Sequence, residues 1–249
     1  MKFLKWLVLI TLALLCCACA KNDPLAYVDE DAEWVIYGNL EEILEHRLWD
    51  KIQNQIRNYD DVEQFVEVLE KSIEATPDEC SAKFALWGQL DKWGTHKEVT
   101  CVIVLKDLDA DDVIRKYTKF WEEDVGGNVK KTTVGNCPAY KFYRTYYFYN
   151  EKEEYLQFSI ARIDKKIIQV FFQAEPESIA KPTNKSKLAK QIDNDCIAGI
   201  AVDGDLIRGG LKEKFPGFKT PKVGDAVVML FADDDQIKIE GTVDISNID

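Results

Sequence analysis

The feature that most constrains this fold is a run of β-forming sequence in the middle of the chain. Four stretches rich in β-branched and aromatic residues follow one another there, with only short connections between them: 129–134, 139–149, 155–163 and 166–173. Two parallel strands need a crossover of a dozen or more residues, which these connections cannot supply. The sequence therefore predicts an antiparallel meander.

Upstream of the meander, strand and helix patterns alternate. Strands are expected over 33–37, 82–90 and 98–105, and apolar residues at helical spacing predict two helices between residues 39 and 77 and another from 107 to 123. With the strand at 129–134 this gives the order βαββαβ of ferredoxin-like folds. We therefore predict an α+β protein, with a mostly antiparallel sheet and helices packed on one face.

The composition divides the chain into five parts. Residues 1–20 form a signal peptide, 21–32 a leader, and 33–175 the main α+β domain. Residues 176–195 are polar and lysine-rich, and we expect a helical connector there. Residues 196–249 then repeat a strand, a helix and a hairpin. We expect this last part to be a shorter second β-α-β-β copy, packed on the main domain.

The N-terminus has the three parts of an export signal. Lys2 and Lys5 give a basic start, residues 6–20 are almost wholly apolar, and small residues end the run in the sequence ACA at 18–20. The apolar run is about 15 residues long, whereas a helix needs about 20 to cross a bilayer. We therefore expect a cleaved signal rather than a transmembrane anchor.

Cys19 stands where bacterial lipoproteins carry their anchor. Ala18-Cys19 resembles the core of the lipobox, in which a small residue precedes a cysteine that becomes lipidated. Cys16 occupies the place where that box usually has leucine. Cys17 is the alternative site, because leucines precede it as in the lipobox. The residue directly before Cys17 is however Cys16 and not the small residue that the box requires. The resemblance implies that acyl chains anchor the protein at a membrane through its N-terminus.

The same resemblance implies a location. The residue directly after Cys19 is Ala20 and not aspartate. In this the chain is similar to lipoproteins that are released to the outer membrane of Gram-negative bacteria. We therefore expect an envelope protein on the exported side of a membrane, in the outer membrane or the periplasm. Cleavage before Lys21 is the alternative, and it implies a soluble secreted protein. The stretch 27–44 resembles the opening of uncharacterised exported bacterial proteins, from which no activity carries over.

The net charge limits the possible partners. It is −12 at pH 7, and nucleic acids and anionic lipid surfaces attract proteins through a basic footprint. Neither is therefore expected to bind the body of this protein, and the N-terminal lipid has to provide any contact with a membrane.

The cysteines outside the signal leave two possibilities open. They are Cys80, Cys101, Cys137 and Cys196. In an oxidising compartment they could form two disulfides, in one of three connectivities. The alternative is buried free thiols, and Cys101 has the surroundings of a core position on a strand.

Catalytic motifs are absent from the sequence. It contains no GxSxG elbow, P-loop or GxGxxG pattern, and its only histidines, His46 and His96, lie among polar neighbours. No cofactor is expected.

One carboxylate cluster resembles a metal site in part. Asp107, Asp109 and Asp111 alternate as at the start of a calcium loop, where such side chains converge on one cation. The loop requires glycine and glutamate further on, where this chain has Asp112 and Thr118. A helix start, where carboxylates cap free backbone N–H groups, is the favoured interpretation.

The stretch 139–149 is unusually aromatic. Seven of its eleven residues are aromatic, and on a strand they alternate between two faces. One face carries Tyr143, Tyr147 and Tyr149, and we predict it to contact a protein or glycan partner, because tyrosines combine an apolar ring with a polar tip. The other face is expected to be core. Coverage of both faces, or stabilising cross-strand pairs, is the alternative.

These observations lead to one functional prediction and one alternative. We expect an exported, lipid-anchored envelope protein with a non-catalytic binding or structural role. The alternative is a carboxylate-based, metal-dependent enzyme or a calcium-binding protein of the envelope.

Overall fold

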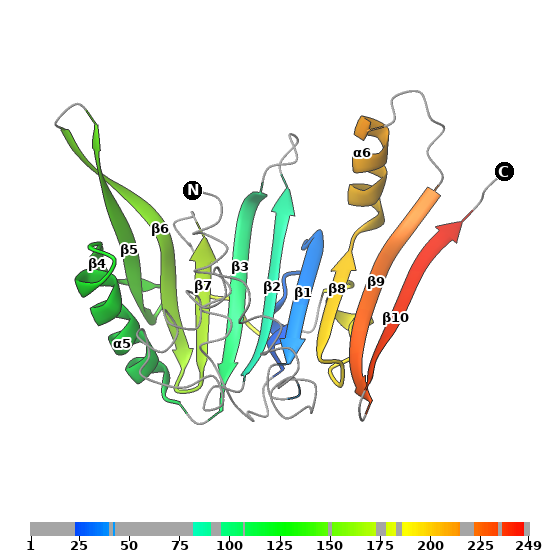
Figure 1. The fold of residues 1–249 in the computed structure, drawn as a ribbon, viewed down its shortest axis with the longest axis horizontal. Helices are drawn as coiled ribbons and strands as arrows, with labels where there is room; N and C mark the ends of the chain where they lie inside the picture. Colours follow the sequence, from blue (N-terminus) through cyan, green and yellow to red (C-terminus); the bar gives the residue numbers. More distant parts are fainter. Residues whose placement is uncertain are drawn as a thin grey trace.

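The computed structural model describes residues 23–39, 42, 82–90, 96–106, 108–148, 151–172, 178–182, 186–214, 222–233 and 236–246. These residues form one ten-stranded antiparallel sheet, in the order β10-β9-β8-β1-β2-β3-β7-β6-β5-β4 (Figure 1). The strands are β1 Trp34–Asn39, β2 Ala82–Leu90, β3 His96–Leu105, β4 Asn128–Val134, β5 Cys137–Phe148, β6 Glu151–Asp164, β7 Ile167–Phe172, β8 Ala198–Val202, β9 Lys222–Asp233 and β10 Gln236–Ser246.

Few helices accompany this sheet in the described part of the chain. The α-helices are α5, Ala110–Glu123, and α6, Gly204–Lys214, and two short 3-10 helices are η1, Pro24–Tyr27, and η3, Ala189–Gln191. No helix among the described residues has the length and apolarity needed to span a bilayer. The two helices expected between residues 39 and 77 lie outside the described residues, apart from Glu42.

The predicted meander is confirmed. β4, β5, β6 and β7 are neighbours in the sheet, and each pairs antiparallel with the next. Only Gly135 and Asn136 separate the paired ends Val134 and Cys137. Gly135 has φ +56°, in the left-handed region that tight hairpin turns require and that glycine adopts without steric cost.

The predicted α+β fold, with helices packed on one face and a ferredoxin-like order, is wrong, because the described residues are mostly strand and include only two α-helices. One antiparallel sheet runs through the whole described chain, and β4 lies at its far edge, separated from β3 by β7, β6 and β5. β8, α6, β9 and β10 follow one another in the expected β-α-β-β order, and β8 pairs with β1, so that their strands continue the same sheet.

The burial of the strands gives the physical reason for this order. β7 has the sequence IIQVFF, and five of its six residues are buried, which suits an interior place between β3 and β6. β4 instead carries Lys130 and Lys131, which suit a solvated edge. The order of strands along the sequence therefore does not give their order in the sheet.

Each face of the sheet carries its own core. On the first face, which we call the α5 face, helix α5 covers β3, β7, β6 and β5 through a cluster that includes Ile103, Ile114, Tyr117, Trp121, Phe142, Phe158, Ile160, Ile168 and Val170. On the opposite face, η1 and the segment around η3 cover β1, β2, β3, β8 and β9 through a second cluster that includes Leu25, Tyr27, Val35, Tyr37, Trp87, Val102, Leu188, Ile192, Ala201 and Val227.

Aromatic packing holds α5 on its face. The Tyr117 ring lies 5.6 Å from that of Phe142, and the Trp121 ring lies 5.1 Å from that of Phe158, both at steep angles. Phe142 and Phe158 stack on each other across β5 and β6, with centroids 4.6 Å apart. Such pairs add about 0.5–1.5 kcal/mol each to the burial of the rings. The aromatic strand β5 therefore has a core face, as the sequence predicts.

Candidate interaction surface

The far end of the α5 face, over β8, β9 and β10, is wholly non-polar. Residues directly opposite each other in an antiparallel pair point to the same face. The register sets Ile200 opposite Val228, and Leu230 opposite Ile239. We call the resulting set the aliphatic surface: Ala198, Ile200, Val202, Ala226, Val228, Leu230, Ala232, Ile237, Ile239, Gly241 and Val243.

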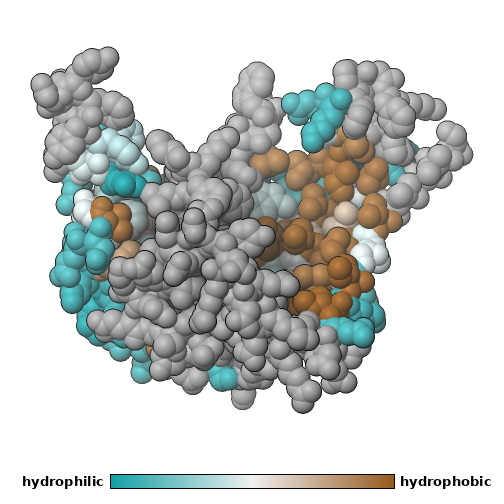
Figure 2. All heavy atoms as spheres, in the orientation of Figure 1, coloured by the Kyte–Doolittle hydropathy of each residue, from teal (hydrophilic) through white to brown (hydrophobic). Residues whose placement is uncertain are grey.

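This surface is open to solvent. Five of its large members are exposed, by 69% at Ile239, 53% at Val243, 47% at Ile200, 44% at Val228 and 40% at Ile237, while Val202 and Leu230 are half-buried. Figure 2 shows the patch as a continuous brown area over the β8–β10 end of the sheet. Monomeric soluble proteins rarely expose contiguous apolar patches, and such patches mark interaction sites.

The reverse side of β8 and β9 is packed. Ala201 and Val227 alternate with the exposed residues and are fully or nearly fully buried in the second cluster. η3 and its neighbours Leu188 and Ile192 provide that cover. On β8 and β9 the aliphatic surface is therefore the uncovered side of strands whose other side lies in the core, whereas β10 is exposed on both sides.

A polar junction around Asp225 holds this end of the sheet together. Its carboxylate accepts hydrogen bonds from Gln191 Nε2 at 2.8 Å and from the backbone N–H of Gly204 at 3.3 Å, and it pairs with Lys187 Nζ at 2.7 Å. Burial acts to raise the pKa of this carboxyl group, but the bonds from Lys187, Gln191 and Gly204 outweigh it and hold the pKa below its usual value. One side chain thus ties β9 to α6 and to the segment before η3.

The strand β10 is amphipathic and forms one edge of the sheet. Gln236, Lys238, Glu240 and Thr242 alternate with the aliphatic residues and point to the other face. Lys238 Nζ lies 2.6 Å from a Glu240 carboxylate oxygen on the same strand. The residues from 236 to 243 are all exposed.

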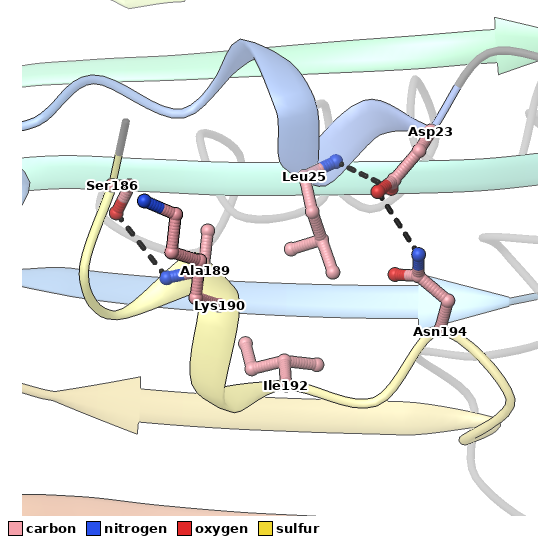
Figure 3. A pocket seen from close by; sticks show the side chains of 7 residues that line it. All are labelled: Asp23, Leu25, Ser186, Ala189, Lys190, Ile192 and Asn194. Atoms are coloured by element: carbon pink, nitrogen blue, oxygen red, sulfur yellow. Dashed lines mark hydrogen bonds between the residues drawn. The ribbon is translucent and has the colours of Figure 1, made fainter. Parts of the chain in front are cut away.

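A small hollow of about 190 Å³ lies on the opposite face (Figure 3). Three of its polar side chains are engaged within the chain: Asp23 accepts from the Leu25 N–H at 2.9 Å and from Asn194 Nδ2 at 2.9 Å, and Ser186 Oγ accepts from the Ala189 N–H at 3.2 Å. The hollow is therefore the joint between η1 and η3. It is lined by Asp23, Leu25, Ser186, Ala189, Lys190, Ile192 and Asn194.

The structure places only part of the predicted tyrosine face. The Tyr143 ring is half-buried, with Lys130 Nζ 4.5 Å from its centroid, and its backbone oxygen accepts a hydrogen bond of 3.0 Å from Trp121 Nε1. The side chains of Tyr147 and Tyr149 lie outside what the structure describes. Their contact role therefore stays a prediction, as does lipidation of Cys19 or Cys17, which lie outside the described residues as well.

The aspartates ahead of α5 act within the fold. The Asp109 side chain caps the helix by accepting from the Asp111 N–H at 2.9 Å, and Asp111 pairs with Arg162 on β6. Asp107 is not described. Across the part of the chain that the structure describes, no group of three or more His, Cys, Asp or Glu residues is placed to hold a metal ion.

Three of the four cysteines are described, and all three are free thiols. Cys101 and Cys196 are buried and Cys137 is half-buried, while Cys80 lies outside the described residues. Burial raises the pKa of the Cys101 thiol, and it raises that of Cys196 to about 11 with help from the nearby Asp193 carboxylate. Both thiols are therefore protonated and unreactive at neutral pH.

Sequence analysis did not identify the aliphatic surface. The signal was present, because isoleucine and valine alternate strictly with polar residues along 236–243 except at Gly241. Such alternation predicts a strand with one buried face. It does not say what covers that face.

Among known proteins, solved structures with a similar fold are found, but no family. No protein-family model matches the chain, and no curated protein matches it. Crystal form III of TP0453, a Treponema protein, is similar with a TM-score of 0.50 at 12% identity, over 92% of this chain and 82% of that chain. Crystal forms I and IV of TP0453 give TM-scores of 0.43 and 0.44, at 13% and 12% identity. At such identity the likeness is one of fold.

Proposed function

We propose that this chain is an exported, lipid-anchored protein of the cell envelope that works by binding another polypeptide rather than by catalysis. Its anchor is Cys19, with Cys17 as the alternative. The observation that carries the proposal is the aliphatic surface, where five large aliphatic side chains are exposed on one face of the sheet. An exposed apolar surface of this kind indicates a protein or a membrane as its partner.

The position of the N-terminus favours a protein over the membrane. η1, which begins at Pro24, packs on the face of the sheet opposite the aliphatic surface. Asp23 follows Cys19 by four residues, and four extended residues span at most about 14 Å. A membrane that holds an acylated Cys19 therefore lies next to the opposite face, and the aliphatic surface points away from it. The net charge of −12 also disfavours an anionic bilayer.

The envelope location is supported by the sequence. The export signal and the lipobox-like Ala18-Cys19 point to the exported side of a membrane. The location rests on these sequence features, because the likeness to TP0453, at 12% identity, is one of fold. Intact mass spectrometry of the protein from its native envelope tests the anchor: a diacylglyceryl adduct is expected on the wild type and on Cys17→Ser, and its loss on Cys19→Ser. Loss on Cys17→Ser instead would move the anchor to Cys17, and an unmodified chain starting at Lys21 would remove it.

Photocrosslinking in the envelope tests the binding role. Ile239, the most exposed member of the aliphatic surface, is replaced by a benzophenone amino acid, and Thr133, exposed on the opposite edge strand β4, serves as the matched control. Irradiation is expected to give a discrete protein adduct at position 239 and none at 133. Absence of any protein adduct at 239, in a folded and exported variant, would contradict the proposal.

A further inference from the structure

We infer that the polypeptide bound at this surface is a second copy of the same chain, which adds its own β10 antiparallel to β10 so that two sheets continue as one. The inference rests on the proposed function, because it names the partner of the same surface. Three observations carry it: the missing neighbour on one side of β10, the length of that edge, and the charge pattern along it.

The exposure of the side chains on the aliphatic surface indicates which neighbour β10 lacks. It is highest at Ile239 and Val243 on β10, while Ile237 on β10 is no more exposed than Ile200 and Val228 on the inner strands. A side chain within a sheet has cross-strand neighbours on both sides, whereas β10, in the part of the chain that the structure describes, pairs only with β9. The neighbour that Ile239 and Val243 lack at this edge is therefore another strand.

The two edges of the sheet differ in how well they resist such an addition. β4 has seven residues and carries adjacent lysines, Lys130 and Lys131, so both of its faces present a charge. β10 has eleven residues and one face without any charge. A long edge strand with an apolar face offers a row of unpaired backbone groups to another chain, and short, lysine-bearing edges prevent this. The open edge is therefore β10.

The sequence of β10 is complementary to itself. In an isologous contact about a two-fold axis, the same patch of each copy meets the other. With Ile239 opposite its equivalent, Lys238 of each copy lies opposite Glu240 of the other, and Ile237 lies opposite Gly241. On one face, two pairs of opposite charges then meet across the contact. On the other face, Ile239 meets Ile239, and Ile237 of each copy lies over Gly241 of the other.

Neighbouring registers lack this match. Centring the two-fold axis on Glu240 would set two glutamates against each other, and centring it on Lys238 would set two lysines against each other. Like charges directly opposite each other destabilise a strand pair. The straight part of the strand also favours the centre at Ile239, because the pairing of β10 with β9 is irregular between Val243 and Ile245.

Charge reversal tests the register. The processed full-length protein is studied by sedimentation equilibrium in density-matched detergent, where the wild type is expected to form a dimer. Lys238→Glu and Glu240→Lys should each weaken the dimer by about tenfold, because two attractive pairs become repulsive. The double variant Lys238→Glu/Glu240→Lys should restore the wild-type dissociation constant. Failure of the double variant to recover would overturn this register.

Cysteine crosslinking tests the geometry of the same contact. Under mild oxidation Ile239→Cys is expected to form a disulfide between two copies, because residues at the two-fold axis face each other at about 5 Å. Val243→Cys is the matched control, since it lies on the same strand and face and is also well exposed, but far from its equivalent. The wild type gives the background from the native cysteines. Equal crosslinking at 239 and 243 would contradict the arrangement.

The two proposals can fail separately. A monomer at all concentrations, together with an Ile239 photoadduct to a different protein, overturns the second copy and leaves the binding role standing. An Ile239 photoadduct with twice the mass of the chain supports both. A monomer with no photoadduct at all overturns both.

Discussion

The two ends of the sheet present the same face to very different surroundings. At the β5–β6 end, α5 covers that face, and Phe142 and Phe158 are fully or nearly fully buried. At the β9–β10 end the equivalent face is the aliphatic surface, where Ile239 and Val243 are largely exposed. Both ends have apolar residues at alternate positions. The difference shows that a strand's pattern provides an apolar face, and that a nearby helix decides whether this face becomes core or surface.

The ends also differ in how their parts are fixed. Ring packing between α5 and the strands dominates at the β5–β6 end. At the β9–β10 end, the charged junction around Asp225 joins β9, α6 and the segment before η3. The two ends should therefore respond to different perturbations: loss of apolar volume at one, and loss of charge at the other.

The largest expected effect is loss of an aromatic ring at the covered end. Phe142→Ala should lower the free energy of unfolding by about 3–5 kcal/mol, because it removes a buried ring and leaves a cavity. Ile239→Ala, on the same face at the open end, should change it by less than about 0.5 kcal/mol in the monomer. Urea denaturation at low protein concentration measures both. Similar losses for the two variants would show that the open end is covered after all.

The next effect concerns the charged junction. Asp225→Ala should lower stability by about 1–3 kcal/mol at pH 7, because the exposed Lys187 and the donors of two hydrogen bonds lose the nearly buried carboxylate that they contact. Since the fold lowers the pKa of Asp225, its carboxylate stabilises the protein above the unfolded pKa of about 3.9, and that contribution is lost as the pH falls through the lower folded pKa.

The pH dependence of this stability loss tests whether the charge of Asp225, rather than its packing, holds the junction. The difference between the wild type and Asp225→Ala should be full near pH 7 and should shrink below about pH 4. Glu122→Ala, which removes an exposed carboxylate from α5, is the control and should change stability little at either pH. A difference for Asp225→Ala that stays constant from pH 7 to pH 3 would show that its charge is not what holds the junction.

The last comparison concerns a pair of glycines, one at each end, and includes the smallest expected effect, that of Gly209→Ala. A Cβ on Gly127 would collide with the Trp121 ring and lie 2.6 Å from the Tyr143 backbone oxygen, the two groups whose hydrogen bond fixes α5. Gly127→Ala should therefore lower stability by about 1–3 kcal/mol. Gly209→Ala in α6 meets nothing within 4 Å and should raise stability by about 0.5–1 kcal/mol. Thermal unfolding measures both, and changes of equal sign would contradict the packing around Gly127.

The sequence by itself determined the local elements of this protein. The alternation and the short connections predicted β4 to β7 as a meander, and the β2–β3 hairpin and the helix after Asp109 also lie where the pattern indicates. Cys101 is buried on its strand as expected. These features depend on neighbours close in sequence, such as a turn residue, a helix cap or a period of two, and so each can be recognised from a few residues.

Only the tertiary structure decided the order of the strands and the cover of each face. Nothing local shows that β7 lies beside β3, that β8 pairs with β1, or that β4 and β10 are the two edges. The same limit applies to the candidate site: the isoleucines of β10 were visible as one face of a strand, but their exposure depends on where α5 lies, at the far end of the sheet. Burial results from contacts between residues distant in sequence. An apolar pattern shows that a strand has one apolar face, but it does not show which part of the chain packs on that face.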